Sequence, residues 1–434
     1  MSVGPARGPA AGLVLLALGA DPREEALLAA MDRSPGRLKV ARRCVDLADL
    51  LAAAEAGVGG QRPVAVVSGS LARLDGVAVS RLAAAGAFVV AVVDRGDDGA
   101  LARVAGLGVA ATVAVGAWTA AGAADDGHSL LADLVGVIAH RGSPAGPGGS
   151  HPARPAPKVD DGGSDDVASV LGRLVAVWGP VGAPGRTTVA VTLADELSRR
   201  QVETLLADAD TYGPALGQTL GSLDEASGLA AAARDANAGA LDVEALARSA
   251  RLVRPGLRVL TGVTRPDRWP ELPASALAVV WRVARGLAVW TVVDCGFCLE
   301  QDEEIAYDTV APRRNGATLT TLAAADVVLA VGGADPVGLQ RLIRTLPDVR
   351  ALAPQATVKV VVNQVRSGPV GRRPERRLLE TVQRYGGADS VLLVPADRAG
   401  LDAAMAAGRT LAEVVPGSAA RTALMALAVE LTQS

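Results

Sequence analysis

The stretch WGPVGAPGRTTVAVTLADEL, residues 178–197, places glycines, prolines, an arginine and two threonines between an apolar and an amphipathic run. It matches the phosphate-binding pattern G-x-x-x-x-G-K-[ST] at Gly185 and Thr187, but Pro180 replaces the first glycine and Arg186 the lysine. Unpaired backbone N–H groups and the helix dipole attract anions where such a loop enters a helix. The pattern predicts a phosphate-binding loop; the alternative is an ordinary strand-to-helix turn. The residues expected to bind phosphate are Gly182, Ala183, Pro184, Gly185, Arg186, Thr187 and Thr188.

Two later apolar runs end in carboxylates. The run VETLLADADTYG (202–213) contains Asp208 and Asp210, and GLAVWTVVDCG (286–296) contains Asp294. A site for a nucleotide with Mg²⁺ needs a hydroxyl and an acid around the metal and another acid near the attacking water, all at the carboxyl ends of neighbouring parallel strands. We therefore expect Thr187 and Asp294 to bind Mg²⁺. The candidate catalytic residues are Asp208, Asp210 and Asp294.

Short apolar runs alternate with helical patterns along most of the chain, which is typical of α/β proteins with parallel sheets. Residues 141–166 interrupt this alternation, because they are rich in Pro, Gly, Ser and Asp and cannot repay the entropy of ordering. The strands expected before them are residues 13–18, 38–42, 63–69, 87–93 and 111–115. The expected organisation is a disordered start (1–10), a first domain (11–140), a flexible linker (141–167) and a second domain (168–434).

Composition narrows the class of protein. A chain of 434 residues, half of them apolar, can bury a large core, and a formal charge of -3 argues against a polycation that coats nucleic acid. Three cysteines and no recognisable secretion signal predict a reducing cytoplasm. No apolar run reaches the roughly 18 residues needed to span a bilayer. The three histidines lack metal-ligand spacing, which argues against zinc and histidine catalysis.

With these motifs in order, residues 171 to about 432 resemble the MinD/ParA superfamily of P-loop ATPases. The family's loop, K-G-G-x-G-K-T-[ST], corresponds to residues 181–188. The run VVNQVR (361–366) resembles the strand whose terminal Asn faces the adenine, which nominates Asn363. The resemblance implies a P-loop NTPase parallel sheet, ATP and Mg²⁺ as cofactors, and a homodimer that forms on ATP binding.

The first domain resembles the receiver domain of response regulators, which implies a flavodoxin-like parallel sheet. A receiver carries a phosphorylated Asp at the end of its third strand, where this chain has Ser68 and Gly69. Only Asp21 remains of the acidic pair after the first strand, and no lysine follows the fifth. Asp94, after the fourth strand, is expected to serve a turn or a cap. We interpret the domain as a pseudo-receiver used for docking.

A pseudo-receiver joined to such an ATPase is the arrangement of the CpaE/TadZ proteins, which localise assembly of Flp pili, and of a related actinobacterial group described as septum-site determining. The resemblance implies a switch that positions a pilus or secretion assembly, or the division septum, through partner proteins. It implies a cytoplasmic protein, at a pole or at the inner face of the membrane through those partners. The alternatives are a ParA-like DNA-partitioning ATPase and a structural adaptor with an inactive nucleotide site.

The sequence departs from the family in its loop. Val181 stands where the family has the lysine that reaches across the dimer, and Arg186 stands where it has the loop lysine, so ATP binding is predicted while hydrolysis stays open. The arginines of residues 366–380 are expected to lie on a solvated helix face, with contact to DNA as the less favoured alternative. Cys295 and Cys298 are expected to be ordinary switch residues rather than a redox pair. The final helix lacks a basic face and is expected to pack on its domain.

Overall fold

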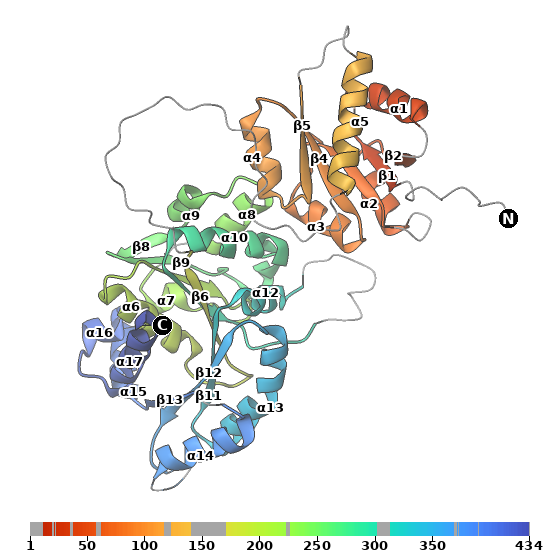
Figure 1. The fold of residues 1–434 in the computed structure, drawn as a ribbon. Helices are drawn as coiled ribbons and strands as arrows, with labels where there is room; N and C mark the ends of the chain where they lie inside the picture. The colour runs from red at the N-terminus through yellow and green to blue at the C-terminus, as the bar shows by residue number, and fades with distance from the viewer. Residues whose placement is uncertain are drawn as a thin grey trace, which may run out of the picture. The chain divides into compact units, whose positions relative to one another are not determined.

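The computed structural model describes residues 12–19, 21, 23–34, 38–57, 62–116, 123–139, 171–222, 226–301, 313–368, 371, 373–388 and 390–433. The chain divides into two compact units, Met1–Val170 and Leu171–Ser434 (Figure 1). The predicted disordered start and the predicted linker at 141–167 lie outside the described residues. None of the helices in the described ranges combines the length and apolar character needed to traverse a bilayer.

The first unit contains a five-stranded parallel sheet with the order β2-β1-β3-β4-β5. This order is that of the flavodoxin-like doubly wound fold, as predicted. The strands are β1 (Gly12–Ala17), β2 (Leu38–Arg43), β3 (Val64–Ser68), β4 (Phe88–Asp94) and β5 (Ala111–Val115). The helices are α1 (Arg23–Arg33), α2 (Leu47–Glu55), α3 (Gly76–Ala84), α4 (Asp98–Gly106) and α5 (Ala123–Ala139).

Burial on both faces explains why these strands are nearly continuous apolar runs. Alternate residues of β3 enter two different cores: Ala65 and Val67 pack toward α2, α3 and α4, whereas Val64 and Val66 pack toward α1 and α5. The helices on the first of these faces begin at aspartate caps, namely Asp46, Asp75 and Asp97. The alternation of strands and capped helices thus builds a three-layer unit.

The carboxyl edge of this first sheet carries no acid at the end of β3. Ser68 is buried there, and its hydroxyl lies 2.9 Å from that of Ser70. Asp94 ends β4; its carbonyl accepts the N–H of Asp97 in the following turn, while its carboxylate forms an ion pair with Arg23. Arg23 also lies 3.2 Å from the carboxylate of Asp21. The turn role expected for Asp94 is therefore observed, whereas the cap of α4 is Asp97.

The second unit contains an eight-stranded sheet with the order β13-β12-β11-β6-β10-β7-β9-β8. All its neighbours pair in parallel except β8, which pairs antiparallel with β9 at one edge. The strands are β6 (Arg173–Trp178), β7 (Thr204–Ala209), β8 (Arg251–Arg254), β9 (Leu257–Leu260), β10 (Trp290–Cys295), β11 (Val327–Gly333), β12 (Thr357–Val365) and β13 (Val391–Pro395). The antiparallel hairpin at 251–260 was not predicted from the sequence.

Helices cover both faces of the second sheet (Figure 1). One core is formed with α6 (Arg186–Arg199), α7 (Leu216–Thr219), α15 (Arg398–Ala407), α16 (Leu411–Val414) and α17 (Ala419–Gln433). The other is formed with α8 (Gly228–Asn237), α9 (Val243–Ser249), α10 (Ala274–Leu287), α12 (Gly316–Ala324), α13 (Pro336–Leu352) and α14 (Pro374–Gly386). A short 3-10 helix, η2 (Pro266–Glu271), precedes α10. The final helix α17 packs on its domain, as expected.

The winding of the chain identifies the functional edge of this sheet. From β6 the chain builds β7, β8, β9 and β10 on one side and then β11, β12 and β13 on the other. The strand order therefore reverses at β6. In open α/β sheets ligands bind outside the carboxyl ends of the strands at such a reversal. The loop that follows β6 lies at this position.

Candidate functional site

The loop between β6 and α6 holds its shape through glycines and a turn. Gly182 and Gly185 have φ values of +75° and +81°, in the left-handed region that side chains disfavour. Ala183 donates its N–H to the carbonyl oxygen of Pro180 at 2.9 Å, which closes the turn. Gly185 precedes the first residue of α6, and no side chain caps this helix start. The first N–H groups of α6 are therefore available to an anion.

All the predicted loop residues, Gly182 to Thr188, lie in this loop or in the first turn of α6. The predicted Asn363, on β12, lies against the same loop and donates Nδ2–H to the carbonyl oxygen of Pro184 at 3.0 Å. A Cβ atom at Gly185 would lie 2.2 Å from that nitrogen. Asn363 is buried, and its amide braces the loop; its predicted contact with adenine stays a prediction.

Thr187 and Asp294 meet directly at the start of α6. The Thr187 hydroxyl donates to Asp294 Oδ2 at 2.6 Å. Asp294 is placed by β10, where it pairs in register with Val177 of β6 and Asp208 of β7. Its second oxygen, Oδ1, is buried and has no hydrogen-bond partner among the described residues. Burial, followed by the nearby charge of Asp208, raises the pKa of Asp294 well above its ordinary value.

This pair fits Mg²⁺ held jointly with phosphate. Mg²⁺ is usually bound by one or two carboxylates together with substrate phosphates and water, rather than by an all-protein cage. Thr187 and Asp294 supply a hydroxyl and a carboxylate with one oxygen open. Within the described part of the chain, no three His, Cys, Asp or Glu side chains cluster to hold a metal by themselves. The donor set therefore suits a metal that arrives with a nucleotide.

Asp208 is engaged by the turn that follows β7. Its Oδ1 accepts the N–H of Asp210 at 3.1 Å, and its Oδ2 accepts the N–H groups of Ala215 and Leu216 at 2.8 and 3.0 Å. Burial raises the pKa of Asp208 to about 6, although these three hydrogen bonds oppose the rise. The carboxylate thus fixes residues 210–216, and its predicted catalytic role stays a prediction.

Arg186 spans the base of the loop. Its Nη1 donates to the carbonyl oxygen of Gly179 at 3.1 Å, and its Nη2 donates to Asp210 Oδ2 at 3.2 Å. Asp210 Oδ1 accepts the N–H groups of Tyr212 and Gly213 at 2.8 and 3.1 Å. The sequence indicated the two side chains separately but not that they pair.

No protein-family model and no curated protein matches the sequence. A ParA family ATPase from Chlorobium tepidum TLS is similar in structure, with a TM-score of 0.50 and 15% identity over 59% of this chain and 98% of that chain. The second unit has the fold of a ParA family ATPase.

Two further solved structures match at lower TM-scores. The cell division ATPase MinD of Pyrococcus furiosus matches with a TM-score of 0.46 and 18% identity, over 61% of this chain and 99% of that chain. The septum site-determining protein MinD of Pyrococcus horikoshii OT3, complexed with Mg-ADP, matches with a TM-score of 0.48 and 16% identity, over 60% of this chain and 96% of that chain.

In this ParA-type fold, the segment after β10 contacts the turn after β7. The rings of Phe297 and Tyr212 lie 4.7 Å apart, and the Arg314 guanidinium lies 4.0 Å from the Tyr212 ring centre. Cys295 is buried and Cys298 is half-buried, and both are free thiols. The two elements that carry Asp210 and Asp294 are thereby linked.

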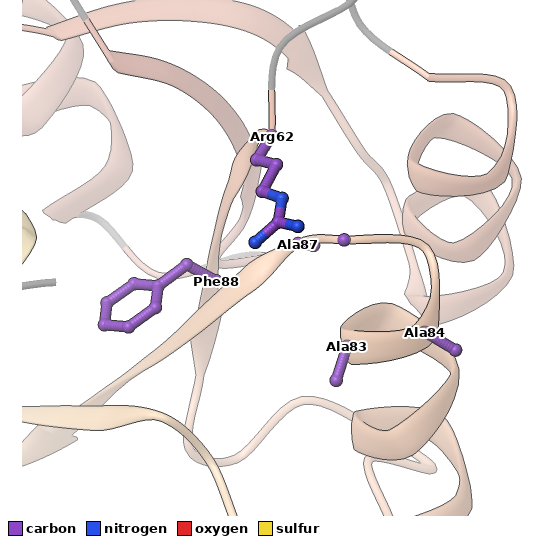
Figure 2. Close-up of a pocket in the computed structure, with 6 residues that line it drawn as sticks. Arg62, Ala83, Ala84, Ala87 and Phe88 are labelled. Carbon is purple, nitrogen blue, oxygen red and sulfur yellow. The ribbon is translucent and has the colours of Figure 1, made fainter. Parts of the chain in front are cut away.

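A hollow of about 670 Å³ adjoins the loop and is lined by Trp178, Pro180 and Val181 together with α13 and residues 297–301. Another hollow, of about 370 Å³, lies in the first unit and is bordered by Arg62, Ala83, Ala84, Gly86, Ala87 and Phe88 (Figure 2). It lies at the amino ends of β3 and β4, opposite the edge where such sheets bind ligands.

Proposed function

We propose that the second unit binds ATP with Mg²⁺ and acts as a nucleotide-dependent switch of the MinD/ParA type. The observation that carries the proposal is the Thr187–Asp294 hydrogen bond beside the uncapped start of α6, with Asp294 Oδ1 buried and open. A hydroxyl, a carboxylate and a row of N–H donors at one point favour a phosphate with its metal over an ordinary turn.

The chain's own groups have distinct proposed roles. The N–H groups of residues 185–188 bind phosphate oxygens, and the left-handed Gly185 turns them toward the ligand. Thr187 and Asp294 hold Mg²⁺, which offsets phosphate charge when bound. Asp208 and Asp210 are the proposed acids near the attacking water. Asp208 is buried and already accepts three backbone N–H groups, which use three of the roughly four acceptor positions of a carboxylate, so little capacity is left to orient a water and we expect slow hydrolysis.

The proposed biological role is spatial positioning. ATP binding would drive formation of a homodimer, and the first unit would select the partner in a pilus or secretion assembly or at the division septum. The proposal rests on the nucleotide site, on the separate flavodoxin-like unit and on the arrangement that the sequence resembles. It places the protein in the cytoplasm, at a pole or at the inner face of the membrane through its partners.

Calorimetry with two matched variants tests the nucleotide site. Wild type is expected to bind ATP with Mg²⁺ at micromolar to millimolar strength. Thr187→Ser keeps the hydroxyl and should keep the Mg²⁺ dependence, whereas Thr187→Val keeps the shape without the hydroxyl and should lose it. Light scattering should show a dimer with ATP but not with ADP. Absence of any binding heat at millimolar ATP and ADP would refute the proposal.

One observation favours the alternative of an adaptor with an inactive nucleotide site. Arg186, the cation of the loop, is already paired with Asp210 and is only 17% exposed. If that pair never opens, calorimetry would find no nucleotide binding and partner binding would be independent of ATP. The DNA-partitioning alternative would instead appear as salt-sensitive binding to nonspecific duplex DNA.

A further inference from the structure

Besides Arg186, which belongs to the β6–α6 segment, an arginine from another helix contacts the loop. Arg341 lies on α13 and donates Nη1–H to the carbonyl oxygen of Val181 at 3.1 Å. Its guanidinium also lies against Gly182, where a Cβ atom would be 2.6 Å from Nη1. The absence of a side chain at Gly182 is what lets Arg341 approach the loop this closely.

The two arginines at the loop differ in how many of their N–H groups already donate to protein acceptors. Arg186 uses both terminal nitrogens on protein acceptors and is largely covered. Arg341 is exposed, and within the described ranges its guanidinium forms one hydrogen bond, to a neutral carbonyl, and no ion pair. An arginine carries five N–H donors in a planar fork that matches phosphate. Arg341 therefore has donors left for an anion.

The position of Arg341 determines which phosphate of a bound nucleotide it can contact. Arg341 lines the hollow of about 670 Å³ that joins Val181 to Phe297, and Phe297 closely follows Asp294 on β10. The proposed Mg²⁺ site at Thr187 and Asp294 belongs to the end of the nucleotide that carries the terminal phosphates. Glu300 and Asp348 line the same hollow and disfavour an anion bound far from the loop.

We infer that Arg341 binds the terminal phosphate of a nucleoside triphosphate held by the loop and so distinguishes ATP from ADP. This inference rests on the proposed function, since it needs a nucleotide in the loop. The Val181 carbonyl holds the guanidinium in place before the ligand arrives. A charged phosphate is a stronger acceptor than a neutral carbonyl, so the remaining N–H groups turn to it on binding.

The test compares affinities for ATP and ADP, each with Mg²⁺, in the full-length protein, with a non-hydrolysable ATP analogue as a further ligand. Arg341→Ala should weaken binding of ATP and the analogue roughly tenfold and leave ADP unchanged, in line with the loss of one charge-assisted hydrogen bond. Arg341→Lys should give an intermediate loss, because an ammonium keeps the charge without the fork. The matched control is Arg344→Ala, which removes an exposed arginine one turn along α13 in the same hollow and should behave as wild type.

The outcomes separate this inference from the proposed function. Equal losses for ATP and ADP in Arg341→Ala would show that Arg341 only braces the loop, and would overturn the inference while leaving the proposed function intact. The same loss in Arg344→Ala would mean that general charge, not this contact, attracts the triphosphate, and would also overturn it. A wild type that binds neither nucleotide would refute the proposed function itself.

Discussion

Replacing Arg186 with lysine tests whether the loop is shaped around a guanidinium. Two separate nitrogens of Arg186 reach two acceptors, the Gly179 carbonyl oxygen at 3.1 Å and Asp210 Oδ2 at 3.2 Å. Lysine has a single terminal nitrogen and no planar fork. We expect it to keep one of these acceptors and to lose the other.

The magnitude follows from the partners that remain. A hydrogen bond to a charged group contributes about 1.5–3 kcal/mol, and its loss costs less where the carboxylate keeps other donors. Asp210 keeps the N–H groups of Tyr212 and Gly213. We therefore expect Arg186→Lys to lower the free energy of unfolding by about 1–2 kcal/mol. Whichever acceptor is lost, one of the two points at which Arg186 holds the loop is released, so ATP turnover should fall about tenfold.

Two measurements check this prediction. Steady-state phosphate release at saturating ATP compares wild type, Arg186→Lys and Arg186→Ala. Denaturant unfolding followed by tryptophan fluorescence reports mainly on the second unit, which holds Trp178, Trp269, Trp281 and Trp290. Arg200→Lys, at the exposed far end of α6, is the control and should change neither quantity. A severalfold faster lysine variant of unchanged stability would refute the reasoning, and equal rates in all three proteins would mean that Arg186 has no catalytic part.

Three further predictions concern single residues. Gly185→Ala should destabilise the protein by about 2–4 kcal/mol, through a left-handed alanine and a Cβ atom 2.2 Å from Asn363 Nδ2. Adding Asn363→Ala should recover part of this loss in denaturant unfolding, and no recovery would show that the overlap is unimportant. Burial raises the pKa of Asp208 from 3.8 to about 6, so the folded protein binds this proton more tightly than the unfolded chain and the free energy of unfolding falls as pH rises through 6. Relative to Asp208→Asn, wild type should lose about 3 kcal/mol of stability between pH 3.5 and 7.5. A stability difference that does not depend on pH would contradict this. The first unit should not be labelled by acetyl phosphate, since Ser68 ends β3 and Arg23 pairs with Asp94; stable labelling that Asp94→Asn abolishes would overturn this.

Local patterns predicted the architecture because strands buried on both faces appear in the sequence as short, nearly continuous apolar runs. The expected strand at 111–115 is observed with those bounds, and the other four of the first sheet differ by about one residue at their ends. The edge strand β8 has no such run. Leu252 and Val253 of β8 are exposed, so the strand has no buried face to give it a regular alternation.

The contacts within the candidate site were harder to predict than its members. The pattern placed Thr187 and Asp294 near one another because Asp294 lies at the carboxyl end of β10 and Thr187 follows the loop at the carboxyl end of the neighbouring β6. It did not indicate the contacts made by Asn363 and Arg341, which come from β12 and α13 and lie more than a hundred residues along the chain from the loop. Such pairs follow from how the sheet is wound, and one sequence contains no local signal for them.

The sequence alone does not explain why Arg186 stands where the P-loop pattern has lysine. Lysine occurs only at positions 39, 158 and 359, so a general preference for arginine would be enough to explain it. The geometry of the loop provides a second reason. The guanidinium bonds to Gly179 on one side and Asp210 on the other, and the loop between them is closed by the Pro180–Ala183 turn and held by Asn363 at Pro184. A loop fixed at these points cannot close in around a smaller cation without breaking one of these hydrogen bonds. The arginine therefore suits the loop that surrounds it, whatever preference first placed it there.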